Sequence, residues 1–127
     1  MTVSVKKEVM NDGANIAACH CTNCYHAGGC TGAINVIARD AAVRITGEPQ
    51  IFEDGDTGSG TPLQRNFCDN CGSPISTVSP NQPGVEVIKL KLFDEIPQPS
   101  MEIFCKSRPD WEKPVDDAEQ FDEMPTK

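Results

Sequence analysis

Cys19-His20-Cys21-Thr22-Asn23-Cys24 is the stretch of this 127-residue chain that constrains its fold most, because it places three cysteines within six residues. A second pair follows in Cys68-Asp69-Asn70-Cys71, directly before a Gly-Ser-Pro turn at residues 72–74. Cysteine thiolates bind Zn²⁺ in a tetrahedron at about 2.3 Å, and a CxxC turn can direct two sulfurs at one ion without straining the backbone. Both segments therefore predict zinc-binding cysteine loops.

Cys19 distinguishes the first segment from a plain zinc ribbon. If Cys19, Cys21 and Cys24 are all ligands, one loop supplies three sulfurs and leaves a coordination position for a substrate. The alternative is a closed site made of Cys21, Cys24, Cys68 and Cys71, which would be structural and inert. A third interpretation is free or redox-active thiols, although neither CxxC lies in a strand-to-helix redox context. We favour the catalytic three-cysteine site.

Length and apolar patterning indicate one small intracellular domain. A chain of this size can build a single modest core, so we expect one domain over residues 1–127. Residues 1–7 lack the apolar stretch of a signal peptide, and no segment approaches the roughly 20 apolar residues of a membrane span. Despite its seven cysteines, the protein is therefore expected in the reducing cytoplasm, not among secreted disulfide scaffolds.

The charge balance limits the partners. With 19 acidic and 11 basic residues, the net charge is -8, so the molecule as a whole repels phosphate backbones and anionic lipid surfaces. We therefore expect no nucleic-acid partner and no membrane partner. A small molecule is the expected substrate.

Turn-forming residues predict an all-β fold of short antiparallel sheets. Ten prolines and ten glycines interrupt the sequence, so no stretch carries a helical stripe of ordinary length. The expected strands are residues 3–9, 16–19, 33–38, 43–46, 51–53, 63–67, 75–78, 85–93 and 101–106. In the longest of these, alternation places Ile88, Leu90 and Leu92 on the inward face.

The chain after Arg108 is polar and acidic. We expect residues 110–123 to form a solvated surface that the rings of Trp111 and Phe121 pin to the body of the protein. His20, between two proposed ligands, is expected to point away from them as a supporting or surface residue, with a proton shuttle as the alternative.

Two further groups of side chains have less specific patterns. Cys30 and Cys105 have no partner at metal spacing and are expected to pack as small apolar residues. Arg65, Lys89 and Lys91 could attract a ligand carboxylate, or they could simply face solvent.

Three motifs in order connect the chain with a known family. They are Cys19 to Cys24, then Arg65-Asn66-Phe67-Cys68-Asp69-Asn70-Cys71-Gly72-Ser73-Pro74, then Lys106-Ser107-Arg108-Pro109-Asp110-Trp111, with Gly29 and Leu92-Phe93-Asp94 between them. Over most of its length the chain resembles the glutathione-dependent formaldehyde-activating enzyme (GFA) family, which includes the centromere protein V domain. The resemblance implies a tent-like all-β zinc fold and carbon–sulfur lyase chemistry on glutathione adducts. It also implies a catalytic zinc on Cys19, Cys21 and Cys24, with Cys68 and Cys71 as half of a structural zinc site.

The chain departs from the family pattern in two places. Members usually begin with a further CxC that completes the structural site, and this sequence starts about where that segment would end. Cys68 and Cys71 would then need water, Cys30, Cys105 or a neighbouring chain as partners. An exposed first strand could also pair with a second copy, so a homodimer is an option. Lys91 stands where the family commonly has glycine, which leaves the substrate open.

These patterns together predict a zinc-dependent carbon–sulfur lyase-like enzyme acting on glutathione adducts or a related thiol or carbonyl small molecule. Zinc on three thiolates is a modest Lewis acid that still keeps an incoming thiol deprotonated near neutral pH. Two alternatives remain. One is a non-catalytic zinc-stabilised binding module, and the other is an enzyme repurposed for a pathway-specific small molecule.

Overall fold

The computed structural model describes residues 1–28, 32–55 and 60–125, and within them strands form two sheets. β1 (Thr2–Val5) and β4 (Val43–Thr46) pair as an antiparallel ribbon, with Val3 opposite Ile45. The larger sheet has the order β10-β9-β2-β3-β8-β7-β6-β5. Its strands are β2 (Ile16–Cys19), β3 (Ala33–Arg39), β5 (Gln50–Asp54), β6 (Leu63–Phe67), β7 (Pro74–Val78), β8 (Val85–Lys89), β9 (Met101–Ile103) and β10 (Glu119–Gln120). The all-β prediction is confirmed.

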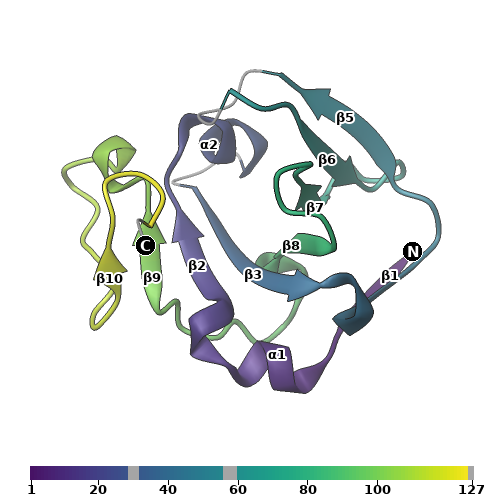
Figure 1. Ribbon diagram of the computed structural model, residues 1–127, viewed down its shortest axis with the longest axis horizontal. Coiled ribbons are helices and arrows are strands. Elements are labelled where there is room, and N and C mark those ends of the chain that lie inside the picture. The colour runs from purple at the N-terminus through teal and green to yellow at the C-terminus, as the bar shows by residue number, and fades with distance from the viewer. Residues whose placement is uncertain (29–31, 56–59, 126–127) are drawn as a thin grey trace.

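Pairing in the larger sheet is antiparallel except at β9. This strand lies parallel to both β2 and β10, with Ala18 opposite Glu102 and Glu102 opposite Gln120. A parallel pair needs a long crossover, and here most of the chain separates β2 from β9. Figure 1 shows the sheet curling from β9 and β10 on one side to β5 on the other.

Two short α-helices lie near opposite ends of β2 (Figure 1). They are α1 (Lys7–Asn11) and α2 (Thr22–Gly28). Single 3₁₀ turns connect other elements: η1 (Gly13–Asn15), η2 (Asp40–Ala42), η3 (Leu90–Leu92) and η4 (Cys105–Ser107).

Three predicted strands are too long, because a turn follows each of them. The strand over residues 3–9 ends at Val5, and the N–H groups of Val9 and Met10 then bond to the Lys6 carbonyl to form α1. The strand over residues 85–93 gives way to η3 after Lys89, and that over 101–106 ends before η4. The inward positions predicted by alternation therefore hold as far as Leu90 and fail at Leu92.

The core is small and lies between the two sheets and the turns beside them. Its fully buried members are Ile16, Val36, Ile88 and Leu90, against which Val3, Val9 and other half-buried apolar side chains pack. The predicted inward face of residues 85–93 is confirmed for Ile88 and Leu90. It is wrong for Leu92, which is 38% exposed because η3 rotates it outward.

The C-terminal segment is held by its backbone, not by Trp111. The indole is 74% exposed, so the predicted anchoring role is wrong for Trp111. Phe121 is half-buried, its N–H donates to the Glu102 carbonyl at 2.9 Å, and its own carbonyl accepts from Cys105 N–H at 2.9 Å. These bonds attach the tail to β9. Within the described residues no helix has the length and apolar character needed to cross a membrane.

Candidate metal centre

The end of β2 and the start of α2 bring three cysteines together. The Sγ atoms of Cys19, Cys21 and Cys24 all lie within 4.8 Å of one another, with Cys19 and Cys24 buried and Cys21 half-buried. Elsewhere in the described chain, no three His, Cys, Asp or Glu side chains come as close as this. The group, called the cysteine trio below, contains the three cysteines that the sequence predicts as catalytic.

Local hydrogen bonds explain the shape of this loop. Tyr25 N–H donates to the Cys21 carbonyl at 3.0 Å and so starts the first turn of α2. Cys24 N–H donates to Cys21 Sγ at 3.3 Å, which holds the two sulfurs of the CxxC turn on one side. Gly32 packs closely against the backbone of Cys19. Its φ is +123°, and a Cβ there would lie 2.3 Å from the Cys19 carbonyl oxygen. Only glycine fits this position without displacing Cys19.

The trio suits zinc in donor type and spacing. A tetrahedral ion with Zn–S bonds of about 2.3 Å needs sulfurs about 3.8 Å apart, and the three Sγ atoms lie within 4.8 Å of one another. Hydrogen bonds that the thiols of Cys19 and Cys24 donate lower the pKa of Cys21 well below its usual range, and Arg65 adds to this effect. Hydrogen bonds with Cys21 and Cys24, followed by burial, raise the pKa of Cys19. Cys21 is therefore the first of the three to become a thiolate.

A polar bridge fixes α2 against the far part of the sheet. Asp54 Oδ2 accepts from Asn23 Nδ2 at 3.1 Å and from Arg65 Nε at 2.8 Å. The side chains of Asp54 and Arg65 are only 14% and 13% exposed. Arg65 is thus an ion-paired residue close to the trio, and the solvent-facing alternative is wrong for it.

Cys68 and Cys71 lie on a separate turn between β6 and β7. Gly72, at φ +76°, donates its N–H to the Cys68 carbonyl at 2.8 Å, and Cys68 N–H donates to the Ser73 carbonyl at 3.0 Å. Cys71 is exposed, and hydrogen bonds from Ser73 lower the pKa of its thiol. In the described part of the chain this pair joins neither the trio nor any third ligand at metal spacing. The four-cysteine ribbon is therefore not assembled here.

The other cysteines do not complete a site with this pair in the described structure. Cys105 Sγ donates to the Glu102 carbonyl at 3.4 Å and contacts Gln120 Oε1 at 3.4 Å, so it packs beside β10. Cys30, like the family-motif residue Gly29, lies outside the described residues.

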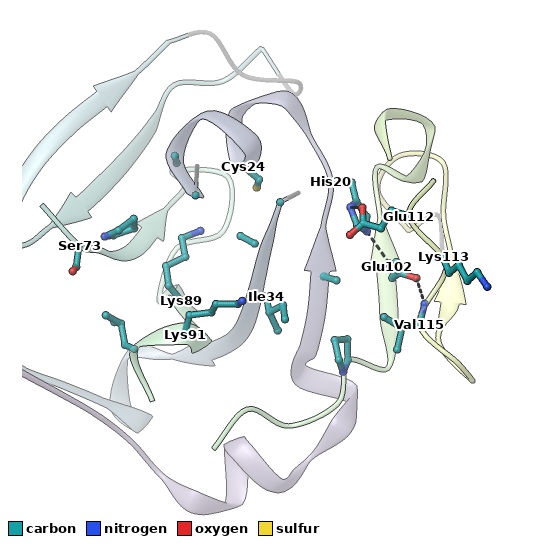
Figure 2. Close-up of a pocket in the computed structure, with 18 residues that line it drawn as sticks. His20, Cys24, Ile34, Ser73, Lys89, Lys91, Glu102, Glu112, Lys113 and Val115 are labelled. Carbon is teal, nitrogen blue, oxygen red and sulfur yellow. Dashed lines mark hydrogen bonds and ion pairs between the residues drawn. The ribbon is translucent and has the colours of Figure 1, made fainter. Parts of the chain in front are cut away.

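A cavity of about 460 Å³ opens beside the trio, and Cys24 lines it. Lys89 and Lys91 line one wall, while His20 and Glu112 line the opposite wall (Figure 2). Burial lowers the pKa of Lys89, an effect that the nearby Cys24 opposes. The ordinary solvent-facing alternative is therefore wrong for Lys89. Lys91 is exposed at the rim.

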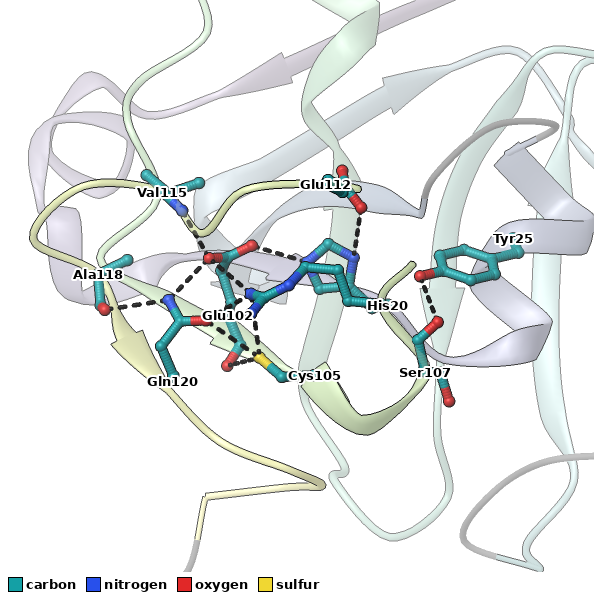
Figure 3. A network of polar contacts seen from close by, with 10 residues as sticks. His20, Tyr25, Glu102, Cys105, Ser107, Glu112, Val115, Ala118 and Gln120 are labelled. Atoms are coloured by element: carbon teal, nitrogen blue, oxygen red, sulfur yellow. Dashed lines mark hydrogen bonds and ion pairs between the residues drawn. The ribbon is translucent and has the colours of Figure 1, made fainter. Parts of the chain in front are cut away.

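His20 belongs to a buried network (Figure 3), so the surface interpretation is wrong, while the supporting and proton-shuttle roles stay predictions. The residue is 4% exposed, and its Nε2 lies 2.7 Å from Glu102 Oε1. Glu102 Oε2 accepts from Val115 N–H and from Gln120 Nε2, each at 2.7 Å, and lies 3.3 Å from an Arg108 nitrogen. Burial alone would raise the pKa of Glu102, but these hydrogen bonds outweigh it and hold the pKa below its usual value.

Glu102 and Glu112 are site residues that the sequence did not predict. Glu102 offers one weak signal, a single charge between Met101 and Ile103 in a short apolar stretch. Glu112 falls within the acidic segment expected to be solvated, but it faces the cavity, with Oε2 3.7 Å from His20 Nδ1. The solvated-surface prediction is therefore wrong at Glu112.

Comparison with known proteins agrees with this architecture. The family model described as glutathione-dependent formaldehyde-activating enzyme matches residues 2–107. The comparison with curated proteins gives no match. Among solved structures, the chain is similar to the crystal structure of a Rhodobacter sphaeroides protein, a Northeast Structural Genomics target. The TM-score is 0.54 at 19% identity, over 75% of this chain and 81% of that one, so the likeness concerns the fold. The chain belongs to the glutathione-dependent formaldehyde-activating enzyme family.

Proposed function

We propose that this protein is a zinc-dependent enzyme that makes or breaks carbon–sulfur bonds in glutathione adducts, or in adducts of a related thiol with a carbonyl compound. The observation that carries the proposal is the convergence of three cysteine sulfurs at a cavity that Cys24 lines. Membership of a family named for glutathione-dependent chemistry supports the thiol part.

The presence of three cysteine ligands, not four, favours a catalytic zinc site over a purely structural one. Cys19, Cys21 and Cys24 would hold the metal, and a fourth position would remain for a group entering from the cavity. When bound, zinc would supply the positive charge that keeps a substrate thiol deprotonated near neutral pH. The cavity, at about 460 Å³, falls within the range of about 300–1,000 Å³ that is typical of small-molecule sites.

The chain's own residues prepare this site. Arg65 and the N–H of Cys24 favour the thiolate of Cys21. Glu102 holds the His20 ring against the cavity wall through Nε2, so the ring keeps one orientation beside a bound ligand. Together these contacts would set the charge of Cys21 and the orientation of His20 beside a thiol adduct, and neither effect involves a redox step.

Metal content tests the ligand assignment. We expect the Cys19→Ser variant to hold clearly less zinc than the wild-type protein, because two sulfurs bind zinc too weakly to retain it. Cys105→Ser is the matched control, since Cys105 lies outside the trio and should leave zinc content unchanged. Equal zinc in wild type and Cys19→Ser would contradict the assignment.

Cobalt substitution tests whether the fourth coordination position of the metal accepts a thiol, and an exchange assay tests the proposed carbon–sulfur chemistry. Adding glutathione should change the visible spectrum of the cobalt protein, and the zinc protein should accelerate exchange between glutathione, formaldehyde and their adduct, measured by NMR line broadening. A spectrum that ignores glutathione would indicate a closed site and would favour a zinc-stabilised binding module instead.

A further inference from the structure

One carboxylate on the cavity wall has an oxygen that no neighbouring group uses as an acceptor. Glu112 Oε2 is buried and accepts no hydrogen bond from the described residues, and its contact with His20 Nδ1 is long, at 3.7 Å. The Glu112 side chain lines the cavity beside the cysteine trio (Figure 2). A buried carboxylate oxygen without a donor is costly, so a hydroxyl group that enters the cavity would be bound favourably there.

The other acid on this wall cannot take the same part, because its oxygens are already used. Glu102 Oε1 lies 2.7 Å from His20 Nε2, and Glu102 Oε2 accepts from Val115 N–H and from Gln120 Nε2. A carboxylate that accepts several hydrogen bonds binds a further proton poorly. Among the described carboxyl groups that line the cavity, Glu112 is therefore the one able to accept a proton from a ligand.

Backbone hydrogen bonds on both sides of Glu112 hold it in place. Its own N–H donates to the Pro109 carbonyl at 3.0 Å, and Val115 N–H donates to Glu102 Oε2 at 2.7 Å. Lys113 also lines the cavity, but Figure 2 shows its side chain extending away from the Glu112 carboxylate. In the described structure the adjacent ammonium therefore does not occupy this carboxylate.

The Glu112 carboxylate is also close to the loop that carries the trio. His20, which it contacts, stands between Cys19 and Cys21 in the sequence, and Cys24 lines the same cavity. In a hemithioacetal whose sulfur lies at the trio, the hydroxyl oxygen is two bonds from that sulfur and so enters this cavity. The hydroxyl must lose its proton for the carbon–sulfur bond to break, because it becomes the carbonyl of the product.

We propose that Glu112 is the catalytic residue that takes the hydroxyl proton of the adduct as its carbon–sulfur bond breaks. The proton passes to Glu112 Oε2, the O–H electron pair forms the carbonyl, and the carbon–sulfur pair leaves with the sulfur as a thiolate. Glu112 then gives the proton to water, so the step needs no oxidant or reductant. In the reverse direction the protonated carboxyl gives its proton to the carbonyl oxygen as the thiolate adds. The inference rests on the proposed function for the reaction itself.

Glu112→Gln tests this role, because the amide keeps the size and a hydrogen-bond acceptor but takes up no proton near neutral pH. In the exchange assay with zinc-loaded protein, glutathione and formaldehyde, its maximal rate should fall about 100-fold or more, since general acid–base catalysis contributes about 10²–10⁴-fold. The concentration that gives half the maximal rate should change little. Glu119→Gln is the matched control, because it removes the same charge from an exposed position, and it should keep the wild-type rate.

Binding of unreactive thioethers gives a second readout that does not depend on turnover. S-(2-hydroxyethyl)glutathione has a hydroxyl group where S-propylglutathione has a methyl group, so the pair isolates the contact with the carboxylate. Calorimetric titration of the zinc-loaded wild-type protein should favour the hydroxyl compound by about tenfold, as expected for a hydrogen bond to a charged group. Glu112→Met should remove this preference.

The possible failures are distinguishable. A wild-type rate in Glu112→Gln, beside an active wild type, would overturn the role of Glu112 alone. Absence of exchange in wild type would overturn the proposed function and this step with it. Circular dichroism and zinc content check each variant, and if Glu112→Gln loses its fold or its metal, the thioether pair decides on wild type. Equal affinities of the two thioethers for wild type, or no binding of either, would overturn the contact.

Discussion

At the scale of single residues, Glu102 joins three parts of the chain that are distant in sequence. One carboxylate oxygen contacts His20, and the other accepts from Val115 N–H and Gln120. The carboxylate is almost fully buried, so its charge depends on these donors for stabilisation. It therefore couples the position of His20 to the order of the C-terminal segment.

Replacing Glu102 with glutamine should lower the free energy of unfolding by about 1–3 kcal/mol at neutral pH, because charge-assisted bonds become ordinary ones. Folding depresses the pKa of Glu102, so its stabilisation is complete above the unfolded-state pKa and is lost as the pH falls through the folded-state value. Urea denaturation from pH 7 to pH 3 measures the free energy of unfolding. The difference in this free energy between wild type and Glu102→Gln should therefore become smaller as the pH falls. Glu119→Gln, at an exposed β10 position, is the control. A difference that grows as the pH falls would contradict this assignment.

Gly32 gives a second prediction at this scale. In Gly32→Ala the new methyl group would meet the Cys19 carbonyl at 2.3 Å, so the chain must shift Cys19. We expect the free energy of unfolding to fall by more than about 1 kcal/mol, and zinc affinity in a chelator competition to fall as well. Gly13→Ala is the control, because a Cβ there meets nothing within 4 Å. Wild-type zinc affinity in Gly32→Ala would show that Cys19 is not held by this close approach.

At the scale of elements, the junction between β8 and η3 decides which side chains reach the core and which reach the cavity. β8 ends at Lys89, and the 3₁₀ turn that follows keeps Leu90 buried while it turns Leu92 outward. Lys89 and Lys91, on the other side of the chain from Leu90, both line the cavity.

The two leucines of η3 should therefore respond differently to truncation. Leu90→Ala is expected to reduce the free energy of unfolding by about 2–5 kcal/mol, as for other fully buried leucines. Leu92→Ala should change it by less than about 1 kcal/mol, because Leu92 is 38% exposed. Thermal unfolding of the two variants measures the difference. Similar losses in both would mean that strand alternation continues through residue 92.

The sequence predicted those elements whose signals are local. The strands at residues 16–19, 43–46 and 63–67 agree with the structure, and the trio is close in space because its members are close in sequence. The Glu102 network could not be predicted in this way, because its partners lie up to 82 residues away and have no fixed spacing. Trp111 was wrongly assigned for a related reason. The size of the indole indicates burial, but backbone bonds to Glu102 and Cys105 already hold the segment.

At the scale of the whole molecule, the small core makes metal binding important for stability. Four fully buried apolar residues form the centre of the hydrophobic cluster, and short chains with modest cores commonly gain stability from metal cross-links. In the proposed site, zinc would link the end of β2 to α2 and so join residues on both sides of the loop at Cys21.

Removing zinc should therefore lower the unfolding midpoint of the wild-type protein. If zinc is present at 100 times its dissociation constant, its loss corresponds to about 2.7 kcal/mol. Differential scanning calorimetry with and without EDTA measures this change. Cys105→Ser should respond as wild type does, whereas Cys19→Ser should show little response. A wild-type midpoint that EDTA leaves unchanged would contradict a stabilising zinc.

The contact between His20 and Glu102 also has a consequence for biosynthesis. The two residues are 82 positions apart, so the cysteine trio leaves the ribosome long before the strand that carries Glu102 has been made. During that interval the three thiols belong to an unfinished nascent chain, exposed to oxidants and to competing metal ions in the cell. The growing polypeptide would therefore benefit from a reducing environment before its binding wall is complete.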